Sequence, residues 1–538
     1  MSTNKNITRR DFFKKAAIAG VGAATVGLAG CSTPGGSGND TTDITWDLET
    51  DVVIIGYGFT GACAAITALE GGASVTIIDK APAAGGSSRT SVGMIHTAVG
   101  ADNVDDWKNS RIAQLFGTVP DATVKAFVDE QFKLPDWFKN DLGAELNLLN
   151  LPGRGQAAQL KVDGKPTNGK GLFEFLSGKA EEKGAKVILS CPAVALIRKP
   201  GSNEIIGVEV MQDGASKNFK AKKAVVLACG GYENNPAMQA DFHWPGIPFV
   251  PWGTPYNTGD GLKLAIDAGA DLWHWQNFEY AGIAPKKAYD ELPNHDVFSL
   301  NYNSKSLGMV NKTNSFMIVN LDGNRFFDES VSVTHQKSTV LHFNDFSDAL
   351  GRYINYPFFF ICDEARIQSG PLAPPLKYGD NLFTYSSLFS DYKWSEDNSA
   401  ELNSGWITKA DSIDDLANKL GINADGLKAT LTAFNQNAQN ATDPVFGRPA
   451  ANLAPLTPPF YGLECLVSVI NTMGGPKRNE LSQILDFDSK PIPRLYGGGE
   501  FGSLNGGVLY TIGNICEAIT SGKVAGEQIS ALNPWDAA

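Results

Sequence analysis

The stretch that decides the fold is DVVIIGYGFTGACAAITALEGGASVTIIDK, residues 51–80. Residues 52–55 form an apolar run, which is typical of a parallel-sheet strand buried on both faces. Gly56, Gly58 and Gly61 then fit G-x-G-x-x-G, which allows a tight turn, close approach to a pyrophosphate and close packing of the next helix. A second strand, 74–78, ends at Asp79, near the distance at which an acid accepts ribose hydroxyls. The stretch therefore predicts a dinucleotide-binding α/β unit.

The composition is that of a folded globular protein of two or three domains. The chain has 538 residues, of which 43% are apolar and 19% are charged. Its formal net charge of −13 argues against nucleic acid as a partner. The six cysteines after Cys31 form no C-x-x-C pair, so we expect no zinc, iron–sulfur or c-type haem site.

The N-terminus carries a predicted export signal. The segment TRRDFFK, residues 8–14, precedes a run of small and apolar residues at 16–30, as in a twin-arginine signal. The run ends in LAGC, which resembles a bacterial lipobox and favours lipidation of Cys31 over an ordinary cleaved signal. Residues 32–47 are predicted to be a flexible linker. We therefore expect an exported protein, either lipid-anchored to the outer face of the cytoplasmic membrane or periplasmic.

The rest of the chain predicts one domain built from two distant segments. The strand 224–228 runs into Gly230, and residues 492–500 repeat this order of strand and glycine turn before a helix that opens at Gly513. Between them lies a lobe richer in aromatics and prolines, in which SIDD at 412–415 starts a predicted helix through 431. The expected boundaries are a signal at 1–31, a linker at 32–47, an α/β Rossmann-like domain at 48–275 and 471–538, and an inserted α+β lobe at 276–470.

From about residue 48 to 533 the chain resembles the flavoprotein family of fumarate reductase, succinate dehydrogenase and FAD-dependent 3-ketosteroid dehydrogenase. The resemblance rests on ordered motifs: GYGFTG, AGGSS, VVLACGGYENN, TPYNTGDGLKLAIDAGA, IVNLDGNRFFDES, DPVFGR, NTMGGPKRN and LYGGGEFGSLNGGVLYTIGN. It implies FAD as the cofactor and a central lobe that acts as a mobile cap over the substrate. Where covalent members have a histidine this chain has Ser87, which implies non-covalent FAD.

The resemblance also implies which residues contact FAD. Asp79 is expected at the adenosine ribose, Gly86 and Ser87 at the pyrophosphate, and Glu500 at the ribityl side. The helix from Gly513 faces the flavin pyrimidine, where a helix N-terminus stabilises negative charge. The full expected set is Gly56, Gly58, Gly61, Asp79, Lys80, Gly86, Ser87, Ser88, Gly93, Ala193, Gly230, Asp260, Glu500, Gly513, Asn514 and Ile515.

The departures from the family pattern bear on the substrate. Dicarboxylate-reducing members carry two histidines and two arginines in Q-x-H-P-T, T-T-R-D, H-H-T-M-G-G and N-R-L-G-G-N. The corresponding positions here are Phe278, about Val333, Asn471 and Tyr510. The guanidinium group of arginine binds a carboxylate through two parallel hydrogen bonds. The loss of both arginines therefore predicts a larger and less anionic substrate than fumarate. Phe278, Asn471, Tyr280 and Tyr302 are the expected substrate-binding residues, although an aromatic such as Tyr280 or Tyr302 is also a common packing residue.

Tyr510 is the candidate catalytic residue, because ketosteroid dehydrogenases also place a tyrosine there. We hypothesise that hydride passes from FAD N5 to an electron-poor alkene while Tyr510 polarises the conjugated carbonyl or protonates the α-carbon. The alternative is that Tyr510 only packs against the flavin. Elsewhere, Arg325 is predicted to pair with Asp328 or Glu329 as a structural contact, and Arg154, Lys477 and Arg478 are candidates to bind an acidic tail of a substrate.

Three functions remain open on the sequence. The first is a respiratory reductase of a conjugated C=C bond, of enone or acrylate type, that takes electrons from a separate cytochrome or membrane quinol dehydrogenase. The second is a ketosteroid-type dehydrogenase that passes electrons to quinone. The third is a flavin electron-carrier lipoprotein without substrate chemistry, which the presence of a closing lobe disfavours. The identity of the alkene or ketone, the physiological direction and the oligomeric state are not fixed by the sequence.

Overall fold

The structure is a computed structural model that describes residues 44–97, 104–151, 155–243, 249–251, 253–292, 314–330, 342–373, 377–378, 381–382, 392–504 and 513–537. The predicted signal, the lipidation site Cys31 and most of the linker lie outside these residues. So do Arg154, Tyr302, Val333 and Tyr510. Residues Ile44–Ala538 form one compact unit.

The first sheet is built from strands at both ends of the chain. Its order is β23-β24-β10-β1-β2-β7; the five strands from β24 to β7 run parallel to one another, and β23 is antiparallel to β24. Four consecutive residues of β1, 52–55, are buried, as expected for a strand covered on both faces. The strands are β1 Leu48–Ile55, β2 Val75–Ile78, β7 Lys186–Ile188, β8 Ala193–Arg198, β9 Ile205–Gln212, β10 Ala215–Leu227, β23 Gln483–Leu485 and β24 Pro491–Gly497.

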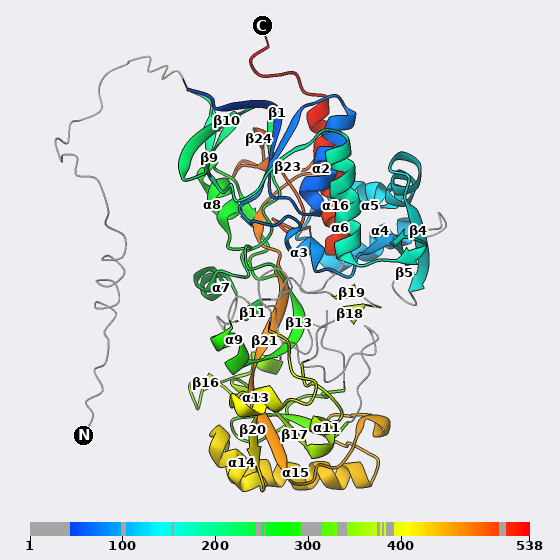
Figure 1. Ribbon diagram of the computed structural model, residues 1–538, viewed down its shortest axis with the longest axis vertical. Helices are drawn as coiled ribbons and strands as arrows, with labels where there is room; N and C mark the ends of the chain where they lie inside the picture. Colours follow the sequence, from blue (N-terminus) through cyan, green and yellow to red (C-terminus); the bar gives the residue numbers. More distant parts are fainter. Residues whose placement is uncertain are drawn as a thin grey trace, which may run out of the picture. The chain divides into compact units, whose positions relative to one another are not determined.

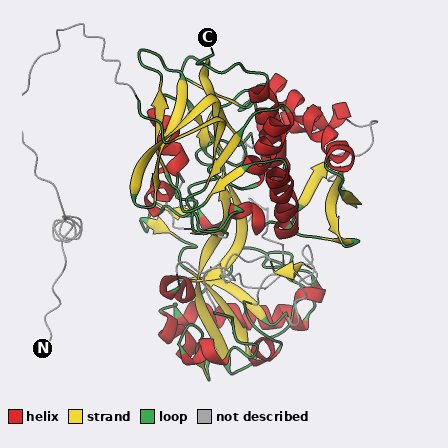
Figure 2. Cartoon of the chain, turned by 45° about the horizontal axis from the view of Figure 1, so that its top comes forward, coloured by secondary structure: helices red, strands yellow, loops and turns green. Residues whose placement is uncertain are grey.

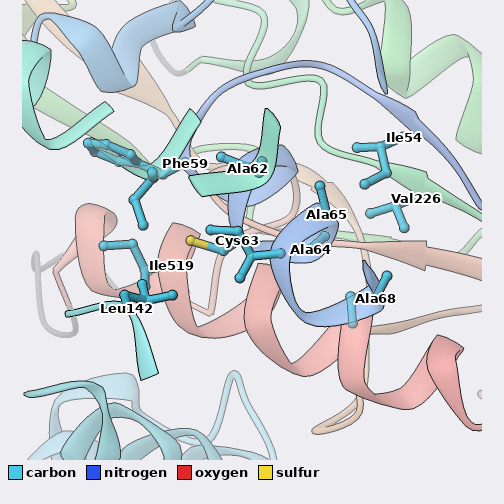
Figure 3. Packing of buried hydrophobic residues seen from close by; sticks show 14 of the residues in the cluster. Ile54, Phe59, Ala62, Cys63, Ala64, Ala65, Ala68, Leu142, Val226 and Ile519 are labelled. Carbon is cyan, nitrogen blue, oxygen red and sulfur yellow. The ribbon is translucent and has the colours of Figure 1, made fainter. Parts of the chain in front are cut away.

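Three helices pack beside one another against this sheet: α2 Phe59–Glu70, α6 Gly169–Glu182 and α16 Asn514–Ser530 (Figure 1). Small residues let α2 and α16 approach closely, since a Cβ at Gly522 would lie 2.3 Å from the Thr60 carbonyl oxygen. Figure 3 shows Cys63, Ala64 and Ala65 of α2 between Ile54 and Val226 of the sheet and Ile519 of α16. The two ends of the chain therefore share one hydrophobic core, as the sequence predicts.

A four-stranded sheet and a group of helices extend this domain. Its order is β3-β5-β4, with β6 paired to β5. The elements are β3 Met94–Thr97, α3 Gly86–Arg89, α4 Val104–Leu115, α5 Asp121–Asp136, the π-helix Trp137–Asp141, β4 Glu145–Leu151, β5 Gly155–Val162 and β6 Lys165–Pro166. Two helices lie between the sheets in sequence, α7 Pro236–Phe242 and α8 Asp260–Asp267.

The second sheet forms the cap, which Figure 2 shows as a separate group of strands flanked by helices. Its order is β11-β21-β17-β14, with β13 and β20 also paired to β21. The strands are β11 Val250–Pro251, β13 Phe278–Pro285, β14 Phe316–Asn320, β17 Phe358–Asp363, β20 Thr408–Ala410 and β21 Phe460–Thr472. The long β21 begins in the cap core and ends at the first domain, so it connects the two sheets.

Short elements complete the cap and its junction. They are β12 Leu272–Trp273, α9 Lys286–Glu291, β15 Phe346–Ser347, β16 Arg352–Tyr353, α11 Glu364–Gln368, β18 Lys377–Tyr378, β19 Asn381–Leu382, α13 Ser399–Asn403, α14 Ile413–Leu420, α15 Ala424–Gln439, the 3-10 helix Ala450–Asn452 and β22 Gly475–Pro476. No helix within the described ranges is long and apolar enough to span a bilayer.

The helix predicted from Ser412 through 431 is wrong as a single element, because it is two helices. Ser412 does cap the first, accepting a 3.1 Å hydrogen bond from the Asp415 backbone N–H. Gly421 then ends α14 with φ 74°, a left-handed conformation that glycine adopts without strain. Asn423 caps α15, and its side-chain oxygen accepts from the Gly426 N–H at 2.8 Å.

Candidate FAD site

The main cavity opens at the carboxyl ends of the parallel strands of the first sheet. Gly56 follows β1, Asp79 follows β2, Ala228 follows β10 and Gly498 follows β24, and all four line the cavity. Ligands of open α/β sheets bind at this edge, because loops and helix N-termini converge there. From this end the cavity extends to Asn471 of β21.

The glycine turn leaves no room for side chains. Gly56 has φ 105°, and a Cβ there would lie 2.2 Å from the Ala228 carbonyl oxygen. A Cβ at Gly61 would lie 2.1 Å from the Gly56 carbonyl oxygen, so this glycine packs the helix on the turn. Gly58 precedes α2 and gives the helix no side-chain cap, and although the Phe59 N–H donates to Ser88 Oγ at 3.0 Å, the positive end of the helix dipole still favours a phosphate here.

The acid at the end of β2 is held by the backbone around the turn. One oxygen of Asp79 accepts a 2.9 Å hydrogen bond from the Tyr57 N–H, and the other accepts from the Ala81 N–H at 2.8 Å. Burial raises the pKa of Asp79, whereas these two N–H groups oppose the rise. A carboxylate has further lone pairs for ribose hydroxyls, so the position suits a sugar.

Polar side chains fix the neighbouring loops. Ser88 Oγ accepts from the Phe59 N–H at 3.0 Å, which ties α3 to the start of α2. Lys80 Nζ donates to Thr258 Oγ1 at 2.6 Å and forms an ion pair with Asp260. All of these residues except Thr258 line the cavity.

Two glutamates and one asparagine meet at the cavity wall. The amide nitrogen of Asn257 donates to Glu233 Oε1 at 2.6 Å and to Glu500 Oε1 at 3.1 Å. Thr472 Oγ1 lies 3.1 Å from Glu233 Oε2, and Asn257 also reaches Ser87 Oγ at 3.2 Å. Burial raises the pKa of Glu233 to about 7, and burial together with the charge of Glu233 raises the pKa of Glu500 well above its usual range.

A second group of polar side chains lies where β21 meets α16. Asn514 Nδ2 donates to Asn471 Oδ1 at 2.9 Å and also to the carboxylate of Glu279. Asn471 is 1% exposed, and its amide group acts on Glu500, lowering the pKa of that carboxyl against the effect of burial. The cavity therefore has a neutral donor at its β21 end.

Most of the predicted cofactor residues meet in this cavity. The lining includes Gly56, Gly58, Asp79, Lys80, Gly86, Ser87, Ser88, Ala193, Gly230, Asp260, Glu500, Asn514 and Ile515. Three predicted residues do not line the cavity: Gly61, Gly93 and Gly513. Gly61 packs against the glycine turn, and Gly513 precedes α16. A Cβ at Gly93 would lie 2.6 Å from the Asn168 backbone.

The predicted substrate residues fall in two places. Asn471 lines the cavity, whereas Phe278 and Tyr280 lie in the cap core. The Phe278 ring lies 4.7 Å from the Phe249 ring and 5.2 Å from the His243 ring, centroid to centroid. Tyr280 is fully buried, and its hydroxyl has no hydrogen-bond partner among the residues that the structure describes.

Sequence reasoning missed Glu233, Asn257, Glu279 and Thr472. Glu233 and Asn257 stand inside quoted motifs, GGYENN and TPYNTG, but the spacing of a motif does not tell which polar residue points inward. Glu279 and Thr472 lie beside predicted positions on β13 and β21. Both side chains are buried, with 3% and 0% of their surface exposed, and this burial cannot be read from the sequence.

The structure assigns the arginines that the sequence left open. Arg325 forms a bidentate pair with Glu329, both contacts at 2.6 Å, and also contacts Asp443 at 2.9 Å, so its predicted pairing with Glu329 is confirmed. Arg478 is 3% exposed and pairs with Glu517, and Lys477 pairs with Asp271 at 3.4 Å. Both cations form ion pairs within the protein and neither lines the cavity, so their contact with an acidic tail of a substrate stays a prediction.

The comparison with known families agrees with this site. Residues 51–509 match the family described as FAD binding domain. The chain belongs to this FAD-binding flavoprotein family. The chain is 27% identical to digoxin reductase of Eggerthella lenta over 590 residues, with 99% of this chain and 98% of the relative covered. It is 28% identical to vinyl phenol reductase of Lactiplantibacillus plantarum, with 84% and 89% covered.

A solved structure supports the fold. The 3-ketosteroid delta1-dehydrogenase from Sterolibacterium denitrificans is 20% identical, with a TM-score of 0.72 over 90% of this chain and 99% of that chain. The predicted α/β fold, an FAD-binding domain with an inserted cap, is confirmed. The protein is an FAD-dependent oxidoreductase that acts on CH–CH bonds.

The residues of the cavity fit FAD. Gly86 has φ 48° and no atom within 4 Å of a Cβ position, so the first residue of α3 leaves open space in the cavity. The N-terminus of α2 suits the pyrophosphate, Asp79 suits the adenosine ribose, and Glu500 and Asn514 also line the cavity. When bound, FAD supplies hydride chemistry, while the protein orients the reactants and handles protons.

Proposed function

We propose that this protein is an exported FAD-dependent reductase of a conjugated C=C bond in a neutral enone- or acrylate-type compound. The observation that carries the proposal is the charge of the cavity. Among the described residues of the lining, the basic side chain is Lys80, and it is paired with Asp260 beside Asp79. Asn471 and Phe278 occupy the positions at which dicarboxylate reductases have histidines. At these two positions no positive charge is available to bind a dicarboxylate substrate.

Neutral groups take the place of that clamp. Asn471 lines the cavity as a neutral amide, which suits a carbonyl oxygen of the substrate, and Asn514 donates to the Asn471 side-chain oxygen at 2.9 Å. The Phe278, Phe249 and His243 rings pack against one another, so apolar packing and not a cation occupies the position of the histidine. The two relatives described above support this reading, because their names are those of reductases and they match most of their length to this chain.

Reduction of a conjugated alkene needs a proton as well as a hydride. We propose that Tyr510 delivers it to the α-carbon or donates a hydrogen bond to the conjugated carbonyl. Asn471 then orients the carbonyl, and the closed cap excludes water.

The cellular setting is part of the same proposal. The twin-arginine signal and Cys31 support export and a lipid anchor. An exported reductase has no access to cytoplasmic NADH, so a separate cytochrome or quinol dehydrogenase would supply its electrons.

The test is to reduce the purified holoprotein with dithionite under anaerobic conditions and follow the flavin absorbance. An enone, a vinyl phenol, an acrylate, a steroid and fumarate are then added separately. Reoxidation by a neutral conjugated alkene and not by fumarate supports the proposal, whereas preferred reoxidation by fumarate overturns it. Loss of the oxidised flavin absorbance on addition of a saturated ketone would instead assign the reverse, dehydrogenase direction. No change in flavin absorbance with any compound would assign an electron carrier.

A further inference from the structure

Glu233 and Glu500 form a pair of buried carboxyl groups that share one amide. Both accept from the same nitrogen, Asn257 Nδ2, at 2.6 and 3.1 Å. The two glutamates come from different parts of the fold, one after β10 and the other after β24. Glu233 is 1% exposed and Glu500 lines the cavity.

The ion pairs of the described chain leave this pair without a cation. The lysine at the cavity, Lys80, is paired with Asp260, and Arg478, which donates to the carbonyls of Gly497 and Gly499 near Glu500, is paired with Glu517. No described lysine, arginine or histidine forms a salt bridge with Glu233 or Glu500.

The other titratable groups around the pair do not neutralise it. Tyr232 directs its hydroxyl away, to the Trp275 carbonyl at 2.7 Å and the His243 ring at 3.1 Å. Glu279 adds a third negative charge, which acts on Glu500. Two buried carboxylates that share a site without a cation cannot both ionise at neutral pH, as in other carboxyl dyads.

A second observation ties the pair to a ligand. Asn257, Glu500 and Asn471 line the cavity, and the Asn471 amide acts on the Glu500 carboxyl. The pair therefore stands at the wall of the cavity that holds FAD in this family.

We propose that Glu233 and Glu500 act together as a proton-holding pair of the FAD site. The two carboxyl groups together carry one proton at neutral pH, and Asn257 bridges them. When an external reductant adds two electrons to the bound cofactor, negative charge enters the cavity, and the pair binds one additional proton from solvent. No other bond forms or breaks at the pair, and reoxidation returns that proton. The inference depends on FAD binding and not on the identity of the substrate.

The test is a potentiometric titration of the bound flavin at several pH values on both sides of neutrality, with dithionite as reductant. The wild-type protein is expected to take up about one more proton per two electrons than Glu233→Gln in the window around pH 7. The control is Glu204→Gln, which removes a glutamate paired with Arg494 at 2.6 Å outside the cavity and is expected to keep the wild-type slope. Equal slopes in wild-type and Glu233→Gln protein overturn the proposal.

A second measurement decides the matter if Glu233→Gln loses FAD. A carboxyl whose pKa rises from 4.5 to about 7 on folding costs stability as pH rises through that interval. The unfolding free energy of the FAD-free wild-type protein should therefore fall between pH 4.5 and about 7 relative to that of FAD-free Glu233→Gln. Parallel curves for the two proteins would show that the site holds no proton. Neither measurement uses a substrate, so a wrong substrate class leaves both results intact.

Discussion

Arg478 and Glu517 form an ion pair in which 2% and 1% of the two side chains are exposed. The Glu517 carboxylate also accepts from Ser503 Oγ and from the Leu504 N–H, both at 2.6 Å. One carboxylate in the first turn of α16 therefore holds the last described residues before the segment that contains Tyr510. A buried pair of this kind matters most when one partner is removed, because the other is left charged in a dry environment.

Arg478→Met should therefore lower the free energy of unfolding by about 3–5 kcal/mol, measured by urea denaturation. Lys490→Met is the matched control, since Lys490 and Asp488 form a pair with 73% and 75% of their side chains exposed. We expect no measurable change in that variant. A small loss in Arg478→Met would mean that solvent reaches Glu517.

Gly61→Ala should reduce the FAD content of the purified protein. The added Cβ would meet the Gly56 carbonyl oxygen at 2.1 Å, which forces α2 away from the turn. The flavin absorbance per protein measures this. Gly178→Ala in α6 adds the same methyl group at an exposed site with no atom within 4 Å, and it should stabilise the protein by about 0.5–1 kcal/mol without loss of FAD.

Tyr280→Phe separates packing from substrate binding. The buried Tyr280 hydroxyl has no partner among the described residues, so its removal should keep or raise the unfolding free energy by about 1 kcal/mol. If Tyr280 contacts the substrate, KM rises in the same variant. Tyr461→Phe is the control: its hydroxyl donates to Glu364, and its loss should destabilise the protein by about 1 kcal/mol. Unchanged KM in Tyr280→Phe would assign Tyr280 to packing alone.

Tyr510→Phe should keep FAD and lower kcat for the conjugated alkene by about 10²–10⁴-fold, the usual contribution of a positioned proton donor. Stopped-flow reoxidation of the reduced flavin measures the step directly. Full turnover with unchanged FAD occupancy would remove Tyr510 from the chemistry.

The parts of the site that the sequence predicted are those that depend on local geometry. Gly56 and Gly61 are required by a turn of a few residues, and Asp79 lies at a fixed spacing from them. Arg325 and Glu329 are four residues apart in sequence, so their pairing was predictable as a local contact. The motif around Glu500 resembles the family, and this resemblance predicted that the C-terminal segment belongs to the FAD site.

The parts that the sequence did not predict depend on long-range contacts. The Glu233–Asn257–Glu500 contact joins three loops, and only the order of strands in the sheet brings these loops together. The same holds for Arg478, which reads as a free surface cation until Glu517 is placed beside it. The break at Gly421 was visible as a glycine, but a glycine inside a helical pattern does not by itself end a helix.

The strand β21 has a mechanical consequence. One end of it, Phe460, pairs with β17 and β20 in the cap, and the other end carries Asn471 and Thr472 beside the Glu233 carboxylate. A continuous strand of 13 residues, hydrogen-bonded along both sides, behaves as a stiff lever. Any tilt of the cap that carries β21 with it would displace the Asn471 and Thr472 side chains at the cavity wall, so cap position and cofactor contacts are coupled through this strand.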